Sequence, residues 1–291
     1  MSGYEALVAD SVRLISLPDI YLRTRVVLND PDSAASELGD VLLADPGLTA
    51  RVLRLANSSF YGFRAKVETI TRAVALLGRQ QIHDVVLATS VARAFTDVDI
   101  EMMDVSRFWR ESIYTALVSR IVAKLCNVLD SERLFVHGLL CDLGHLIMYQ
   151  KIPELARQAL TVSQTDARLI THVEQELIGY DYTQVGGELL RIWDMPPAMQ
   201  GSVRWHMDPG SADEHLLDAS IVHIASLLAT VMDSQEDADL FTLPFSPEAL
   251  RVTHVSEDTL LKVRMEAHSY LEEACRYLLP GDMAGGASVS G

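Results

Sequence analysis

The chain has 291 residues and a formal net charge of −16, from 24 lysines and arginines against 40 aspartates and glutamates. With 49% hydrophobic and 22% charged residues it can fill a large core, which excludes a chain that is disordered throughout. The acidity disfavours nucleic acid as a direct partner, because most of the surface would repel a phosphate backbone.

Cysteine usage and the N-terminal residues bear on the cellular compartment. Cys126, Cys141 and Cys275 are odd in number and far apart, which favours free thiols in a reducing environment over a disulfide framework. The first thirty residues include Glu5 and Asp10 and contain no long apolar segment, and no apolar run in the chain is long enough to span a membrane. We therefore expect a soluble, cytoplasmic protein.

Helical periodicity dominates the chain and no alternating strand pattern is evident, which predicts an all-α fold. The N-terminal part predicts helices at 6–15 and 20–28, a third that carries Leu38, a fourth that begins at Asp45-Pro46, and two more that end at Gly78 and near Phe95. In the fourth helix the apolar residues share one face, namely Leu48, Val52, Leu55 and Ala56.

An acidic stretch at 96–104 has little to pack and predicts a hinge. Further helices are expected at 108–125, 132–150, 156–160, 167–178, 183–193, 197–204 and 216–232, followed by an acidic linker and a helix capped by Ser256. The resulting architecture is a two-lobed multi-helix bundle. Its expected parts are an N-terminal lobe at 1–100, a second lobe at 101–235, and a C-terminal helical extension at 236–291 with a flexible tail.

Several short motifs are distinctive: Asn29-Asp30-Pro31, the run from Asp45 to Ser58, Phe108-Trp109-Arg110, the run from Gly138 to Gly144, Val185-Gly186, and Trp205-His206. Together they resemble the HDOD family over most of residues 10–230. The resemblance implies an all-helical bacterial signalling module. Its second lobe would be similar to the HD phosphohydrolases, and HDOD modules commonly lack the metal site of those enzymes.

The HD metal site can be compared residue by residue. HD phosphohydrolases bind metal through a His, a His-Asp pair and a later Asp, because the metal must activate water and neutralise phosphoryl oxygens. The matching positions hold Glu111, Cys141-Asp142 and Ser226, so only Asp142 is retained. Serine is a weak ligand and a thiolate is unusual in an oxygen-rich dinuclear site. The resemblance therefore implies no bound metal, no cofactor and no enzymatic activity.

A weaker metal motif remains within the same segment. His137, Cys141 and His145 are four residues apart on the predicted helix 132–150, which would place them on one face. No fourth ligand is evident, so structural roles are favoured. Tyr182 and Trp205 occupy positions where relatives with extra histidines carry them. The other histidines are interpreted as structural, among them His172, His206, His215 and His223.

Signatures of other chemistry are missing, because the sequence has neither a nucleophile elbow nor a glycine-rich phosphate loop. Its most basic region contains Arg51, Arg54, Arg64 and Lys66, for which a solvated helix flank is favoured over a site for an acidic or phosphorylated ligand. Candidates for contact with a partner protein are Arg51, Arg54, Asn57, Tyr61 and Trp109. For Asn57 a structural role is preferred.

We therefore predict a non-catalytic HDOD protein that serves as an interaction scaffold for other signalling or regulatory proteins, without direct contact to nucleic acid or membrane. Two alternatives stay open. One is a metal-dependent HD-type phosphohydrolase or phosphodiesterase. The other is a sensor that binds a small-molecule second messenger in the vacated metal cleft without hydrolysing it. The oligomeric state is not predicted.

Overall fold

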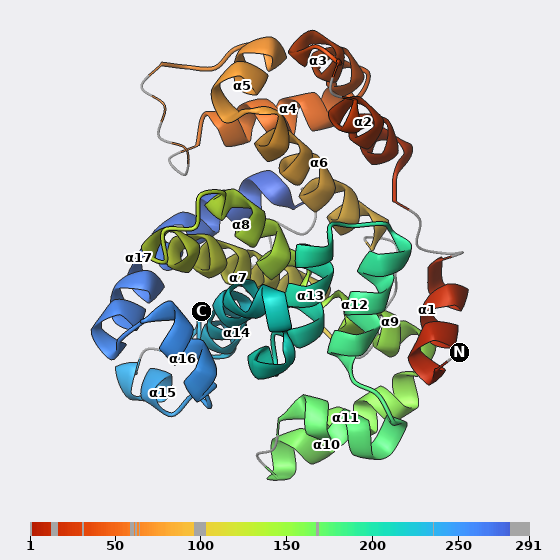
Figure 1. Ribbon diagram of the computed structural model, residues 1–291, viewed down its shortest axis with the longest axis vertical. Helices are drawn as coiled ribbons and strands as arrows, with labels where there is room; N and C mark the ends of the chain where they lie inside the picture. Colours follow the sequence, from red (N-terminus) through yellow and green to blue (C-terminus); the bar gives the residue numbers. More distant parts are fainter. Residues whose placement is uncertain are drawn as a thin grey trace, which may run out of the picture. The chain divides into compact units, whose positions relative to one another are not determined.

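The computed structural model is built from helices alone in the part of the chain that it describes, which confirms the all-α prediction (Figure 1). The described residues are 2–12, 17–30, 32–58, 61, 63, 65–95, 103–166, 169–234 and 236–279. None of the described helices is both long enough and apolar enough to cross a lipid bilayer.

The helices form two compact units, as the two-lobed prediction requires, although the division runs elsewhere than expected. Unit 1 comprises Met1–Ser16 and Val98–Ala267, and unit 2 comprises Leu17–Asp97 and His268–Gly291. The first helix thus belongs with unit 1 and not with an N-terminal lobe at 1–100. The expected extension at 236–291 is not a separate part, because its residues divide between the two units.

Unit 1 contains α1 and a continuous series of later helices. Their bounds are α1 (Gly3–Val12), α7 (Val105–Leu125), α8 (Ser131–Leu140), α9 (Leu143–Lys151), α10 (Pro153–Asp166), α11 (Ile170–Ile178), α12 (Tyr182–Ile192), α13 (Pro197–Trp205), α14 (Leu216–Thr230), α15 (Asp237–Phe241) and α16 (Pro247–Thr253), with short 3₁₀ turns at Pro209–Ser211 and Asp213–His215. Helix α17 (Glu257–Leu278) begins in this unit and ends in unit 2.

Helix α7 is the central element of unit 1. Asp104 caps its first turn by accepting hydrogen bonds from the backbone amides of Ser106 and Arg107 at 2.9 and 3.2 Å. From Ser112 to Ala123 side chains are buried all round the helix, as in a core helix, and α8 and α14 pack against it. Trp109, in its second turn, is completely buried.

Helix α1 joins unit 1 by packing on α12 and α9. The Arg204 guanidinium lies 5.6 Å from the centroid of the Tyr4 ring, and Lys151 forms an ion pair of 2.6 Å with Asp10. These contacts explain why the first residues belong with unit 1.

Unit 2 contains α2 (Asp19–Asn29), α3 (Ala35–Leu43), α4 (Pro46–Ala56), α5 (Ile70–Leu77), α6 (Arg79–Ala94) and the end of α17. Several sequence signals are confirmed in it. Asp45 caps α4 with Pro46 in the first helical turn, and the buried face of α4 consists of Leu48, Val52, Leu55 and Ala56. Helix α5 ends at Gly78, whose φ of 88° lies in the region that favours glycine. The expected hinge cannot be placed, because residues 96–102 lie outside the described part of the chain.

Candidate functional site

The predicted helix 132–150 is interrupted at Cys141 and Asp142, which separate α8 from α9. Helix α8 packs on α7, whereas α9 packs on α12. The approach of α9 to α12 is unusually close: a Cβ atom added to Gly144 would lie 1.9 Å from the carbonyl oxygen of Tyr182. The prediction of one continuous helix was therefore wrong, because the segment packs against two different neighbours.

The break separates the three residues of the predicted metal motif. His137 is buried and its Nδ1 lies 2.9 Å from the hydroxyl of Ser202. His145 instead stacks on Tyr182, with ring centroids 3.7 Å apart. His137, Cys141 and His145 therefore do not form one of the potential metal-binding groups among the described residues.

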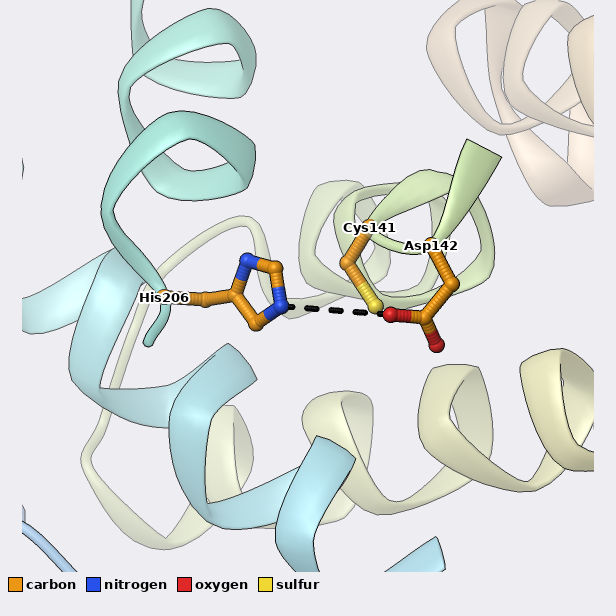
Figure 2. Close-up of side chains that lie close together, drawn as sticks. All are labelled: Cys141, Asp142 and His206. Carbon is orange, nitrogen blue, oxygen red and sulfur yellow. Dashed lines mark ion pairs between the residues drawn. The ribbon is translucent and has the colours of Figure 1, made fainter. Parts of the chain in front are cut away.

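A different cluster forms at the break. Donor atoms of Cys141, Asp142 and His206 all lie within 4.8 Å of one another, and Figure 2 shows the three side chains converging. His206 directly follows α13, and its Nε2 lies 3.9 Å from Oδ1 of Asp142. The sequence interpretation assigned His206 a structural role and gave Trp205, its neighbour, as the position of an additional histidine in relatives. The motif Trp205-His206 therefore marked this part of the site, but the residue beside Asp142 is His206.

Hydrogen bonds fix the protonation of His206. Its Nδ1 lies 2.7 Å from the carbonyl oxygen of Val203, which can only accept, so Nδ1 carries the proton. Its Nε2 lies 2.9 Å from the hydroxyl of Tyr182 and must therefore be the acceptor of that hydroxyl proton. Burial lowers the pKa of His206, which keeps the ring neutral. The lone pair that a metal ion would need is thus already occupied.

Cys141 is also unsuited to metal binding in this state. Its thiol is fully buried, and Sγ lies 3.2 Å from the carbonyl oxygen of Gly138, to which it donates. Burial raises the pKa of the thiol well above its usual range, and the neighbouring Asp142 raises it further. Metal binding would require this thiol to lose both its proton and its hydrogen bond to Gly138.

A cavity of about 530 Å³ opens beside this cluster within unit 1. Three of the positions that match HD ligands line it together, namely Glu111, Asp142 and Ser226. The wall also contains a ring stack, because His145 stacks on Tyr149 as well as on Tyr182. The other lining residues are Met103, Asp104, Arg107, Phe108, Leu160, Ser163, Leu169, Ile170, Met207, Leu227, Ala229 and Thr230. The structure thus brings the sequence-predicted positions to one site.

The two carboxylates of the cavity have different surroundings. Oε1 of Glu111 accepts a hydrogen bond of 2.8 Å from Nε of Arg107. Burial nevertheless raises the pKa of Glu111, and Arg107 only partly opposes the effect. Asp142 faces the neutral imidazole of His206. Glu111 is not part of the Cys141–Asp142–His206 cluster, which is the one potential metal-binding group among the described residues.

The predicted partner-contact residues separate into two groups. Arg51, Arg54, Asn57 and Tyr61 belong to unit 2, in α4 and the segment after it. Arg54 is exposed and Tyr61 is half-buried. Trp109 is 0% exposed in the core of unit 1, so its proposal as a surface contact was wrong. Of the basic region, Arg64 lies outside the described residues, whereas Lys66 is exposed and lies 3.9 Å from Glu68.

Asn57 has the structural role that was preferred for it. Its Nδ2 donates to the carbonyl oxygens of Leu53 and Val67, and its Oδ1 accepts from the amide of Val67, each at 2.7 Å. The side chain thereby joins the end of α4 to the extended segment before α5.

Comparisons with known proteins identify the family. The HDOD domain model matches residues 14–209. An uncharacterized protein of Treponema pallidum (strain Nichols) is 23% identical over 237 residues, which are 79% of this chain and 45% of that protein. This chain thus spans less than half the length of that relative.

Solved structures show the same fold. A protein of Shewanella amazonensis SB2B, named as a candidate phosphohydrolase, is similar with a TM-score of 0.75 and 27% identity over 94% of this chain and 98% of that one. An HDOD domain protein of unknown function from Geobacter sulfurreducens is similar with a TM-score of 0.72 and 23% identity over 94% of this chain and 96% of that one. Because the family model covers most of the sequence, the chain belongs to the HDOD family.

Proposed function

We propose that this HDOD protein is a non-catalytic regulatory protein, which acts by binding other molecules and not by hydrolysing phosphate esters. One observation carries the proposal. Nε2 of His206, in the only cluster of potential metal ligands among the described residues, already accepts the hydroxyl proton of Tyr182. A metal ion could use this nitrogen only if the buried tyrosine moved away.

The remaining residues do not fit the metal pair of an HD phosphohydrolase. Glu111 is held by Arg107, the Cys141 thiol is protonated and points at a carbonyl oxygen, and Ser226 offers only a hydroxyl. Water activation by a metal needs several deprotonated ligands and an open coordination position. These residues therefore support no hydrolytic step. Phosphate ester hydrolysis is the alternative function, and the similarity to the protein named as a candidate phosphohydrolase supports it.

The test is metal analysis combined with hydrolysis assays. Protein produced in medium supplemented with Mn²⁺ and Zn²⁺ should contain far less than one metal ion per chain. It should not hydrolyse bis(p-nitrophenyl) phosphate or a cyclic dinucleotide above the rate of the Asp142→Asn variant. Asp258→Asn, an exposed carboxylate on α17, is the matched control. Stoichiometric metal with turnover that Asp142→Asn abolishes and Asp258→Asn preserves would overturn the proposal.

We also propose that regulation proceeds through another signalling protein that contacts the exposed flank of α4. Arg54 supports this proposal, because it is an exposed guanidinium in a strongly acidic chain and could select an acidic partner. Tyr61 lies after the same helix and its ring stacks on that of Phe63, with centroids 6.1 Å apart. A partially exposed aromatic pair beside an arginine is typical of protein interfaces.

The interaction can be tested by comparing two charge reversals. A partner isolated from native cytosol with the full chain should bind the Arg54→Glu variant at least about tenfold more weakly, because a charge pair becomes a like-charge contact. Lys262→Glu makes the same charge change at an exposed position of unit 1 and should leave the affinity unchanged. Equal affinity of both variants would exclude the α4 flank.

A further inference from the structure

The cavity beside Asp142 is mainly apolar but carries an excess of negative charge. Its described lining contains three carboxylates, those of Asp104, Glu111 and Asp142, and one guanidinium, that of Arg107. The Arg107 guanidinium already pairs with Glu111, and it is largely exposed at the edge of the cavity. Ring faces and aliphatic side chains form most of the remaining wall.

Neighbouring groups do not neutralise Asp142. The nearest ring nitrogen belongs to His206 at 3.9 Å, but this Nε2 accepts a hydrogen bond from Tyr182 and therefore has no proton to donate to the carboxylate. Glu174 adds a further carboxylate behind the wall; it is 1% exposed, accepts a hydrogen bond from the amide of Tyr182 at 2.9 Å, and its Oε1 lies 3.5 Å from Nε2 of His145.

The same carboxylates also act on the tyrosines of the wall. After burial, the carboxylates of Glu174, Asp142 and Glu111 are the groups that raise the pKa of Tyr149. Asp142 and Glu174 act in the same direction on Tyr182. A phosphate ester would add charge of the same sign to this site, whereas a cation would relieve the repulsion.

We propose that this cavity binds an organic cation, a protonated amine carried on an apolar body, and excludes phosphate esters. The ammonium group would lie against Asp142 and Glu111, and the apolar body would pack on the aliphatic and aromatic wall. A volume of about 530 Å³ is within the roughly 300–1,000 Å³ usual for small-molecule sites. The inference goes beyond the proposed function, and it argues against a cyclic dinucleotide as the messenger.

Three probes of similar shape and different charge test the inference on the full chain by titration calorimetry. They are 2-phenylethylammonium, 2-phenylethanol and phenyl phosphate. The ammonium should bind at least about tenfold more tightly than the alcohol, since a charge-assisted hydrogen bond distinguishes them. Phenyl phosphate should give no binding heat.

Two variants and one control variant locate the binding. Asp142→Asn should weaken binding of 2-phenylethylammonium about tenfold, to an affinity near that of 2-phenylethanol. Asp258→Asn should leave the affinity for 2-phenylethylammonium unchanged. Arg107→Gln should preserve or strengthen ammonium binding, because it removes the competitor for Glu111. If the cavity were a phosphate site, Arg107→Gln would instead weaken the binding of phenyl phosphate. Tryptophan fluorescence monitors folding of the variants, because Trp109, Trp193 and Trp205 all lie in unit 1.

Several results would overturn the inference. Equal affinities of the ammonium and the alcohol, or no binding by either, would show that the carboxylates do not select a cation. Binding of phenyl phosphate that Arg107→Gln abolishes would make the cavity a phosphate site. Binding of Mn²⁺ that Asp142→Asn abolishes would assign this carboxylate to a metal ion. Hydrolysis of a phosphate ester without ammonium binding would refute both the non-catalytic function and the cation site. Hydrolysis together with ammonium binding would refute only the non-catalytic function.

Discussion

Replacing Tyr182 with phenylalanine should destabilise unit 1 while preserving its ring packing. The hydroxyl donates to Nε2 of His206 across 2.9 Å, and the two side chains are 3% and 0% exposed. The ring of Tyr182 also stacks on His145 at 3.7 Å, and phenylalanine keeps that contact. The variant leaves a buried imidazole lone pair without its donor, which costs about 1–3 kcal/mol. We therefore expect the free energy of unfolding to fall by that amount.

Urea unfolding followed by tryptophan fluorescence measures this change in unit 1 alone, because all three tryptophans belong to it. A double-mutant cycle of Tyr182→Phe, His206→Leu and the variant with both changes isolates the interaction between the two side chains. Its coupling free energy should be about 0.5–3 kcal/mol. Tyr180→Phe is the control at a partly exposed tyrosine and should change stability by less than about 0.5 kcal/mol.

Two results would show that the hydroxyl does not occupy Nε2 of His206. Either Tyr182→Phe lowers the free energy of unfolding by less than about 0.5 kcal/mol, or the effects of the two single variants on that free energy are additive. The observation that carries the non-catalytic proposal would then be lost.

Three further predictions concern acid stability and packing. Burial lowers the pKa of His137 from 6.5 to about 3, so below pH 6.5 the unfolded chain binds the additional proton and stability falls as pH falls, until about pH 3. At pH 5 the contribution of His137 to the loss of unfolding free energy is about 2 kcal/mol, from about 1.4 kcal/mol for each pH unit below 6.5. Denaturant titrations at pH 7.5 and pH 5 measure this loss. Gly144→Ala should cost about 3 kcal/mol or more in thermal unfolding, because its Cβ would collide with the Tyr182 carbonyl oxygen. Asn57→Ala should cost about 1–3 kcal/mol and accelerate hydrogen exchange at the Val67 amide, which loses its acceptor.

Each of these predictions has a control or a result that contradicts it. His137→Asn should reduce the loss of stability between pH 7.5 and 5, and an unchanged loss would mean that the imidazole is charged when folded. Gly39→Ala, in α3 with the nearest atom at 3.7 Å, should be neutral or stabilising, in contrast to Gly144→Ala. Arg54→Ala should leave stability within about 0.5 kcal/mol, and a loss as large as that of Asn57→Ala would make Arg54 a structural residue.

Local signals in the sequence determined much of the fold. Periodicity predicted the all-α class and the buried face of α4, and capping chemistry predicted the helix start at Asp45-Pro46 and the end at Gly78. Ser256 accepts a hydrogen bond from the amide of Thr259 at 3.3 Å, as its predicted capping role requires. These features depend on residues a few positions apart, so the linear order of the side chains contains the information.

Which residues form the site together could be identified only from the tertiary structure. The motif resemblance identified Glu111, Asp142 and Ser226, and the structure places all three around one cavity. The interruption between α8 and α9 was missed, because periodicity does not report that a segment changes its packing partner. Trp109 was proposed as a surface contact, although it is 0% exposed on a helix whose side chains are mostly buried.

The sequence alone therefore determined the helical class, the family resemblance and the loss of most HD ligands. Only the tertiary structure decided that His206 lies beside Cys141 and Asp142, and that Tyr182 occupies its free nitrogen. Tyr182 and His206 are separated by 24 positions and come from the start of α12 and the end of α13. A hydrogen bond between them depends on how two helices pack, which no local pattern of residues encodes.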